Sequence, residues 1–225
     1  MHGVILNIFH TFKNNRYNIY TMETLLFKES PYIAFGFSFI ALLFYYNSYN
    51  RLFGLSLLVL LILVIFYRYT PYNERHNNNT IISPAQGLVT NIIKKGDRIN
   101  ISIYLNIANN HTQIYPVNGK VINRYYDRSG VFNLVVDMDK SRYNEKKIHT
   151  IKMKDGKIIY VTQIAGYFPR CIASSDEVPE NVKAGDYMGI IKFGSRVDIS
   201  FPGDLDLVKV KVNDKINHGD IIYEY

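Results

Sequence analysis

A glycine followed by a serine, near the end of this 225-residue chain, is the feature of the sequence that could do unusual chemistry. Gly194 and Ser195 stand between two strand-like runs, in the segment 185–202. Common catalytic templates are absent from the sequence, which has no GxSxG elbow, no GxxxxGKS/T phosphate loop and no HExxH zinc motif. The Gly-Ser pair therefore remains as the candidate for a reactive site.

The histidines and the cysteine limit the other chemistry that the chain could do. The six histidines are scattered along the sequence and do not suggest a metal cluster, so no metal is expected. A single histidine could act as an acid or a base, because imidazole exchanges a proton near neutral pH, although a lone histidine is more often structural. The only cysteine, Cys171, excludes an intrachain disulfide and any CxxC metal site.

The elements that must position these residues are mostly strands. From about Ile81 onward, β-branched and aromatic residues recur with period two between Gly, Asn and Asp, which is typical of antiparallel strands. The clearest runs are Ile99–Leu105, Val131–Val136, Lys157–Thr162 and Leu207–Val212. Gly-Asp pairs at 96–97, 185–186 and 219–220 predict turns, because glycine tolerates positive φ and aspartate bonds back to the turn backbone. No long amphipathic helix follows residue 81, so we expect a mainly β domain (β-rich α+β, with short helices) over residues 70–225.

An apolar segment, residues 31–69, precedes this domain and predicts a membrane-anchoring helical hairpin. The 37 residues from Pro31 to Tyr67 contain one charged side chain, Arg51, which stands in a polar turn. Spanning a bilayer takes about 20 helical residues, so each half is marginal alone and a hairpin fits better than one long helix. Aromatic residues at both ends suit a headgroup region. The alternative is a helical hairpin buried within a globular core.

The residues around the hairpin indicate its orientation. Residues 1–30 form a polar N-terminal segment, which disfavours a secretory signal peptide. Basic residues outside the turn outnumber the lone arginine within it, and they are Lys13, Arg16, Lys28, Arg68 and Arg75. The positive-inside bias then places both the tail and the main domain on the cytoplasmic side of the membrane. The net charge of +7 suits an anionic surface such as acidic lipid, whereas nucleic acid is not expected, because there is no basic run and no base-stacking motif.

Several motifs stand in order along the chain. The segment around the Gly-Ser pair reads GxxxGxIxFGSRxDxxxP, with Gly185, Gly189, Ile191, Phe193, Gly194, Ser195, Arg196, Asp198 and Pro202 at the fixed positions. Further short motifs are Ser83–Gly87, His111–Gly119, Asn144–Lys146, Gln163–Gly166 and Arg170. Together these motifs resemble those of the phosphatidylserine decarboxylase family, in particular its short bacterial-type branch. The two ends of the apolar segment also look similar, so the resemblance extends through most of the chain.

This resemblance implies a self-processing, pyruvoyl-dependent lyase. Ser195 Oγ would attack the Gly194 carbonyl, and elimination would then cut the chain between residues 194 and 195 and leave a pyruvoyl group at the new N-terminus. That ketone would form a Schiff base with the amine of phosphatidylserine and accept the electrons left by carbon dioxide, which yields phosphatidylethanolamine. The implied partners are phosphatidylserine, an anionic membrane and the chain's own small fragment, residues 195–225, with a homodimer left open.

The resemblance also suggests roles for single side chains. His111 is the implied acid or base near the substrate carboxylate. Phe193 and Met188 are candidates for lining the headgroup pocket, with core packing as the alternative. Candidates for supporting the site or its processing, or else for stabilising turns and strands, are Arg196, Asn144, Glu145 and Gln86.

Gln86 leaves a second function open. It stands where the family motif has an aspartate that is associated with self-cleavage, and a neutral amide cannot act as a base. An uncleaved pseudoenzyme that uses the β domain as a lipid-headgroup or protein-binding module is therefore the alternative function. A third hypothesis is a decarboxylase for a related amino-acid headgroup or a diffusible amine, since pyruvoyl chemistry needs only a primary amine beside a carboxylate.

Overall fold

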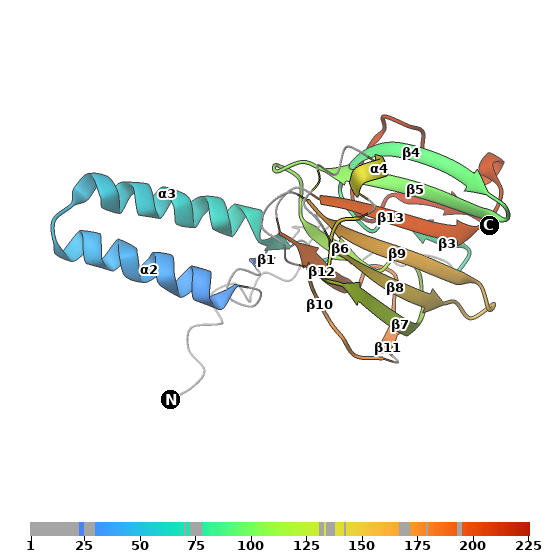
Figure 1. The fold of residues 1–225 in the computed structure, drawn as a ribbon, viewed down its shortest axis with the longest axis horizontal. Coiled ribbons are helices and arrows are strands. Elements are labelled where there is room, and N and C mark those ends of the chain that lie inside the picture. The colour runs from blue at the N-terminus through green and yellow to red at the C-terminus, as the bar shows by residue number, and fades with distance from the viewer. Residues whose placement is uncertain are drawn as a thin grey trace, which may run out of the picture.

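The computed structural model of the chain consists of a helical hairpin and a β domain (Figure 1). The residues that it describes are 23–24, 30–69, 71–72, 78–130, 133, 138–141, 143–166, 172–178, 180–192 and 195–225. The hairpin projects from one end of the β domain, and the C-terminus lies toward the opposite end (Figure 1). The fold is mainly β, as the period-two runs predict.

Two apolar helices form the hairpin. Helix α2 spans Pro31–Tyr46 and α3 spans Asn50–Phe66. In the turn between them Ser48 takes a φ of 61°, and the Asn47 side-chain amide donates to the Leu43 carbonyl at 2.8 Å. Most large side chains of both helices are exposed, so the hairpin is not buried within the globular core. Among the described residues, no helix combines the length and the apolar character that crossing a membrane requires.

The base of the hairpin packs against the β domain. Leu63, Phe66 and Tyr67 form a small apolar cluster with Ala34 and with Ile190 of the β domain. The Tyr67 hydroxyl is hydrogen-bonded to the Ser30 hydroxyl at 2.6 Å, which joins the end of α3 to the start of α2. The two helix ends are therefore held together where they meet the domain.

The β domain is built on one long antiparallel sheet. Its strand order is β11 (Glu180–Val182), β7 (Gly119–Asp127), β8 (Lys146–Lys152), β9 (Ile158–Ala165), β13 (Ser195–Pro202), β5 (Arg98–Leu105), β4 (Gly87–Lys95) and β14 (Lys215–Ile216). The smaller sheets are β10 (Ile172–Ser174), β12 (Tyr187–Ile191) and β6 (Thr112–Ile114); β15 (Ile221–Glu224) with β3 (Thr80–Ile82); and β1 (Glu23–Thr24) with β2 (Arg68–Tyr69). Two short helices complete the fold, α4 (Met138–Ser141) and the 3-10 turn η1 (Leu205–Leu207).

The core lies between the long sheet and the smaller sheets. Alternate residues of β5 and β13 point into it, for example Ile101 on β5 and Ile199 directly opposite on β13. Ile81 of β3, Met188 of β12 and Ile222 of β15 pack against the same cluster from the other side. Alternation places one face of each strand in the core, because successive side chains of a strand point to opposite faces.

Two of the four predicted strands are confirmed, since β5 covers Ile99–Leu105 and β9 covers most of Lys157–Thr162. The prediction of a strand over Leu207–Val212 is wrong, because only an isolated bridge joins Val208 to Tyr223. Beyond that bridge the chain turns toward β4, where the Asn213 N–H donates to the Val89 carbonyl at 2.8 Å. The run therefore contacts β15 only at its start, at Val208 and Lys209, and does not form a strand. The run Val131–Val136 lies outside the described residues except for Asn133.

The predicted Gly-Asp turns are confirmed. Gly96, Gly185 and Gly219 all have positive φ, at 63°, 94° and 94°. Asp186 and Asp220 each accept a backbone N–H three residues earlier, at 2.8 Å and 2.7 Å. Contacts within a few residues therefore stabilise these turns, as the sequence pattern indicates.

Candidate functional site

Ser195 is the first residue of β13 and lies inside the sheet. It pairs with Leu105 of β5 on one side and with Ala165 of β9 on the other. The residue is 0% exposed, and its Oγ has no hydrogen-bond partner among the described residues. Gly194 and Phe193 lie outside the described residues. A buried hydroxyl without a partner is a costly arrangement, which makes this atom a candidate for a chemical role.

His111 is brought next to the segment that leads into Ser195. Its backbone carbonyl accepts the Ile191 N–H at 3.2 Å, and Ile191 ends β12 four residues before Ser195. The imidazole is 0% exposed, and its Nδ1 lies 3.0 Å from the Asn109 carbonyl. A carbonyl can only accept, so Nδ1 carries the proton and the Nε2 of the neutral ring is a free acceptor. No hydrogen-bond partner of Nε2 exists in the part of the chain that the structure describes.

The surroundings of His111 keep its imidazole neutral. The pKa of His111 is lowered from 6.5 to about 4, mainly by burial and also by the positive charge of Arg68, while the hydrogen bond to the Asn109 carbonyl opposes this shift. The ring is therefore uncharged at neutral pH and can take a proton at Nε2.

The end of the hairpin packs directly on this histidine. The Phe66 ring at the end of α3 lies 4.5 Å from the His111 ring, centroid to centroid, with 34° between the planes. Arg68, two residues further on, donates to the Ala108 carbonyl at 2.7 Å and so holds the loop that precedes His111. The hairpin thus contributes to the burial that sets the pKa of His111.

Replacing Phe66 with alanine is expected to raise the pKa of His111 toward 6.5 and to destabilise the junction by about 3–5 kcal/mol, the usual loss for a buried Phe→Ala change. Water reaching the ring removes part of the desolvation that lowers the pKa. The His111 Cε1–H signal, followed by NMR against pH, measures the shift. Phe35→Ala is the matched control, because Phe35 is 66% exposed on the same hairpin. An unchanged His111 titration in the Phe66 variant would contradict this role for the ring.

Gln86 lies beside His111 and joins two loops. Its Oε1 accepts the Asn110 N–H at 2.7 Å, and its Nε2 donates to Asn217 Oδ1 at 2.8 Å. A cleft of about 380 Å³ opens here, lined by Gln86 together with Asn109 and Asn217. The position where the family motif has aspartate thus contacts the backbone of the residue before His111, and here it carries an amide that accepts one hydrogen bond and donates another.

Arg196 and Asp198 support the start of β13. Arg196 donates to the Ser141 hydroxyl at 2.6 Å, which ties α4 to the strand, and its Nε lies 3.0 Å from Asp198 Oδ1. Burial raises the pKa of Asp198, and the neighbouring Arg196 opposes that rise. This arrangement holds the strand that begins with Ser195.

Asn144 and Glu145 hold the strand opposite Ser195. Asn144 donates to the Ala165 carbonyl at 2.9 Å and exchanges two further hydrogen bonds with the Asn133 backbone. The Ala165 N–H in turn donates to the Glu145 carbonyl at 2.9 Å, while the Glu145 carboxylate accepts the Tyr126 hydroxyl. Because Ala165 is paired with Ser195, both residues position the neighbour of the candidate nucleophile. Met188, by contrast, is 2% exposed and packs in the main core.

A buried chain of polar side chains was not among the sequence predictions. Arg124 Nε donates to His149 Nδ1 at 3.2 Å, which leaves the proton on His149 Nε2 for Gln163 Oε1 at 2.9 Å. Gln163 then donates to Gln113 at 2.7 Å, and Gln113 donates to the His111 carbonyl at 2.5 Å. The signal in the sequence is the presence of glutamine and histidine at core-facing positions of strands. This series of hydrogen bonds from Arg124 to Gln113 fixes the backbone of His111 from inside the domain.

Acidification is expected to destabilise the domain through its two buried histidines. Burial is the largest cause that lowers the pKa of both His111 and His149 from 6.5 to about 4. Since both folded pKa values lie below the unfolded value, this stability is complete above pH 6.5 and is lost as the pH falls through about 4, up to about 3 kcal/mol for each histidine. Chemical unfolding at pH 7 and at pH 4.5 measures the loss. The His149→Gln variant, whose residue 149 does not titrate, should lose less unfolding free energy between pH 7 and pH 4.5 than the unchanged protein. An equal loss in both proteins would assign the effect to other groups.

Comparison with known proteins provides independent evidence on the family. A family model described as phosphatidylserine decarboxylase matches residues 62–224. The phosphatidylserine decarboxylase proenzymes of Wolbachia pipientis wMel and Rickettsia typhi are both 32% identical over 203 residues, which cover 83% and 84% of this chain and 87% and 86% of theirs. The proenzyme of Rickettsia bellii is 36% identical over 158 residues, 66% of this chain and 68% of its own. These matches confirm the resemblance that the ordered motifs indicate.

Proposed function

Because this chain belongs to the phosphatidylserine decarboxylase family, we propose that it is a membrane-attached, pyruvoyl-dependent enzyme that converts phosphatidylserine to phosphatidylethanolamine and carbon dioxide. The observation that carries the proposal is the buried Ser195 hydroxyl, which has no partner among the described residues and stands at the head of β13. His111 lies beside the segment that enters this strand. Ser195, the candidate nucleophile, and His111, the candidate proton acceptor, are thus both buried. Each has one polar atom without a hydrogen-bond partner among the described residues.

The first step of the proposal is cleavage of the chain at Ser195. Its Oγ bonds to the Gly194 carbonyl carbon, the peptide C–N bond breaks, and the proton of the hydroxyl passes to the released amine through a base. A base then removes the Cα proton of residue 195 while the Cβ–Oγ bond breaks, so that residue 194 leaves as a carboxylate. The enamine left at residue 195 becomes an imine, which water hydrolyses to the ketone with release of ammonia. The products are residues 1–194 and residues 195–225, the latter beginning with a pyruvoyl group.

The residues present fit such a group. Once formed, the pyruvoyl ketone supplies the electron sink for loss of carbon dioxide from an amino acid. Around it, burial of Ser195 and His111 excludes water, which favours a charged carboxylate leaving as neutral carbon dioxide. His111 Nε2 is unprotonated in the neutral ring, because the ring proton is on Nδ1 toward Asn109, so it can take up the proton that the substrate amine releases and later return it to the substrate carbon.

The helical hairpin supplies the membrane attachment in this proposal. Its exposed surface consists largely of Phe, Leu, Ile and Tyr side chains from α2 and α3, which favours contact with lipid over contact with water. Basic residues outside its turn favour the cytoplasmic side for the β domain. Because the hairpin also packs on His111 through Phe66, the attachment lies next to the site where a lipid headgroup would react.

Gln86 supports the second candidate function, the uncleaved binding module. The neutral amide of Gln86, which bonds to the Asn110 N–H, cannot take the proton that an aspartate at this position could take. In the proposed enzyme, the neutral His111 ring serves as the base in its place. In the alternative, the chain stays whole and binds a headgroup or another protein without turnover.

The test measures the two products of decarboxylation from a labelled substrate. Purified full-length protein in neutral detergent is incubated with phosphatidylserine labelled at the serine carboxyl carbon, and labelled carbon dioxide and phosphatidylethanolamine are measured together. The proposal expects both products in equal amounts, and expects cyanoborohydride plus substrate to inactivate the enzyme. Binding of phosphatidylserine by a folded, uncleaved chain that forms neither product would favour the module instead.

A further inference from the structure

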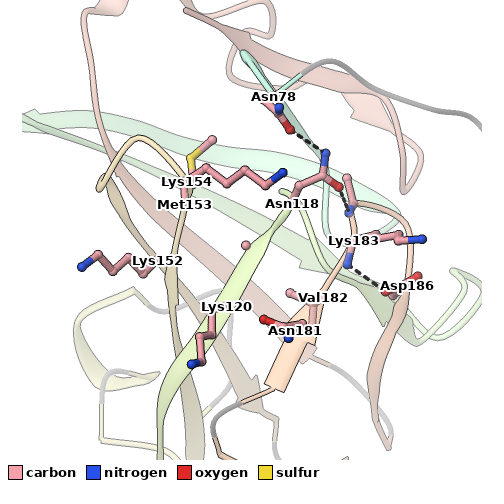
Figure 2. Close-up of a pocket in the computed structure, with 12 residues that line it drawn as sticks. Asn78, Asn118, Lys120, Lys152, Met153, Lys154, Asn181, Val182, Lys183 and Asp186 are labelled. Atoms are coloured by element: carbon pink, nitrogen blue, oxygen red, sulfur yellow. Dashed lines mark hydrogen bonds between the residues drawn. The ribbon is translucent and has the colours of Figure 1, made fainter.

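A cleft lies at the end of the long sheet remote from Ser195. It has a volume of about 830 Å³ and is formed by β7, β8, β11 and the turn after β8 (Figure 2). Along β9 the register places Ala165 opposite Ser195, whereas Ile158 at the other end of the same strand is opposite Lys152 of the cleft. The β8–β9 turn points away from the helical hairpin (Figure 1). The cleft is therefore separate from the site of the proposed chemistry.

Four lysines surround the cleft: Lys120, Lys152, Lys154 and Lys183. All four are exposed, and none forms an ion pair with a carboxylate within the described ranges. Asp186 also lines the cleft, but its carboxylate accepts the backbone N–H of Lys183 at 2.8 Å. Among the described lining residues the formal charge is thus +3.

The sheet register concentrates this charge. Lys120 of β7 and Lys152 of β8 are directly opposite each other, so their side chains leave the same face of the sheet. Like charges in this arrangement repel and destabilise the pairing. Some other surface lysines are paired with carboxylates, as in Lys94 with Asp204 and Lys209 with Glu224. An anion held between the cleft lysines would remove the repulsion.

Hydrogen bonds and close packing hold the frame of the cleft. Asn118 Oδ1 accepts the Ala184 N–H at 2.9 Å, and its Nδ2 donates to Asn78 Oδ1 at 3.0 Å (Figure 2). Gly119 allows β7 and β8 to approach closely, since a Cβ there would lie 2.6 Å from the Lys152 carbonyl oxygen. Buried Met153 and Val182 line the cleft between the charged side chains. The cleft thus combines a cationic rim with some apolar surface on a fixed backbone.

We propose that this lysine cleft binds a phosphate-bearing organic anion at a site distinct from the Ser195 site. Lysine ammonium groups bind phosphate as point charges, and a dianionic phosphate ester matches several of them better than a single carboxylate does. The volume is that of a small-molecule site, and the apolar lining suits the organic part of an ester. The phosphate could belong to a soluble ester or to a lipid headgroup, and the position remote from the hairpin favours the soluble ester.

Calorimetric titration of the full-length protein in neutral detergent tests the proposal. The soluble probes are glycerol 3-phosphate and inorganic phosphate, and the lipid probe is dioctanoylphosphatidic acid in the same micelles. Lys120→Gln/Lys152→Gln is expected to weaken binding by roughly tenfold or more, as loss of two close charges predicts. Lys95→Gln/Lys211→Gln is the matched control, because it also removes two exposed charges but lies outside the cleft.

The probes distinguish the sources of the phosphate. Tighter binding of glycerol 3-phosphate than of inorganic phosphate, lost in the cleft variant and kept in the control variant, supports a soluble ester. Binding of the lipid probe alone, with the same variant response, supports a headgroup as the source. The proposal is overturned if no probe binds, or if the cleft and control variants weaken binding equally, because diffuse surface charge would then account for it.

Discussion

Replacing Ser195 with alanine is expected to leave the chain whole at 225 residues, while the unchanged protein yields fragments of 194 and 31 residues. The substitution removes the oxygen that would attack the Gly194 carbonyl, and no other atom of alanine can replace it. The buried Oγ has no hydrogen-bond partner among the described residues, so its loss should not unfold the domain. Intact mass spectrometry of both proteins measures the result, with a carbonyl-reactive hydrazide to label the new terminus of the small fragment.

Ser200→Ala is the matched control for this experiment. Ser200 belongs to the same strand, and its hydroxyl interacts with Arg98 Nε at 3.1 Å on the partly exposed side. The control variant should be cleaved as the unchanged protein is. Cleavage of the Ser195 variant at the same bond, or a folded unchanged protein that remains whole, would refute self-processing at Ser195.

The second large effect is expected from His111→Ala, which should lower the rate of carbon dioxide release by about 10²–10⁴-fold, the usual contribution of a positioned acid or base. The imidazole of the unchanged protein is neutral and has its Nε2 uncommitted within the described residues, so it is the group prepared to move a proton. Cleavage of the chain is measured separately by mass, and the rate is expressed per cleaved molecule. A rate within a few-fold of the unchanged protein would assign the proton transfer to another group.

The pH dependence distinguishes chemistry from packing at His111. Burial lowers the pKa of this histidine to about 4, so the neutral ring persists from neutral pH down to that value. The rate of the unchanged enzyme should therefore fall as the pH decreases through about 4, when the ring becomes protonated and can no longer accept a proton. The residual rate of His111→Ala should lack this inflection. His149→Gln, which alters the other buried histidine, should retain it.

Local patterns account for what the sequence alone could predict. The run over α2 and α3, whose one charged residue is Arg51, forms helices whose apolar side chains are exposed, because no polar stripe directs one face toward a core. The period-two runs of β5 and β9 become strands, and the glycines at 96, 185 and 219 take positive φ, because these preferences act within a few residues. The ordered motifs around Ser195 and His111 likewise indicated the family without any knowledge of contacts.

Only the tertiary structure shows which distant segments pair or contact each other. The run Leu207–Val212 has the composition of a strand, yet it pairs with β15 only at its start, because the chain then turns toward β4. Phe66 meets His111 only because the hairpin base packs on the domain, and Lys120 meets Lys152 only because β7 and β8 take one register. Contacts across tens of residues depend on how complete sheets pack and pair, which local preference does not encode. The sequence by itself therefore determined the turns, the two helices, several of the strands and the candidate reactive residues. The fold determined which runs pair, the environment of His111 and the separate lysine cleft.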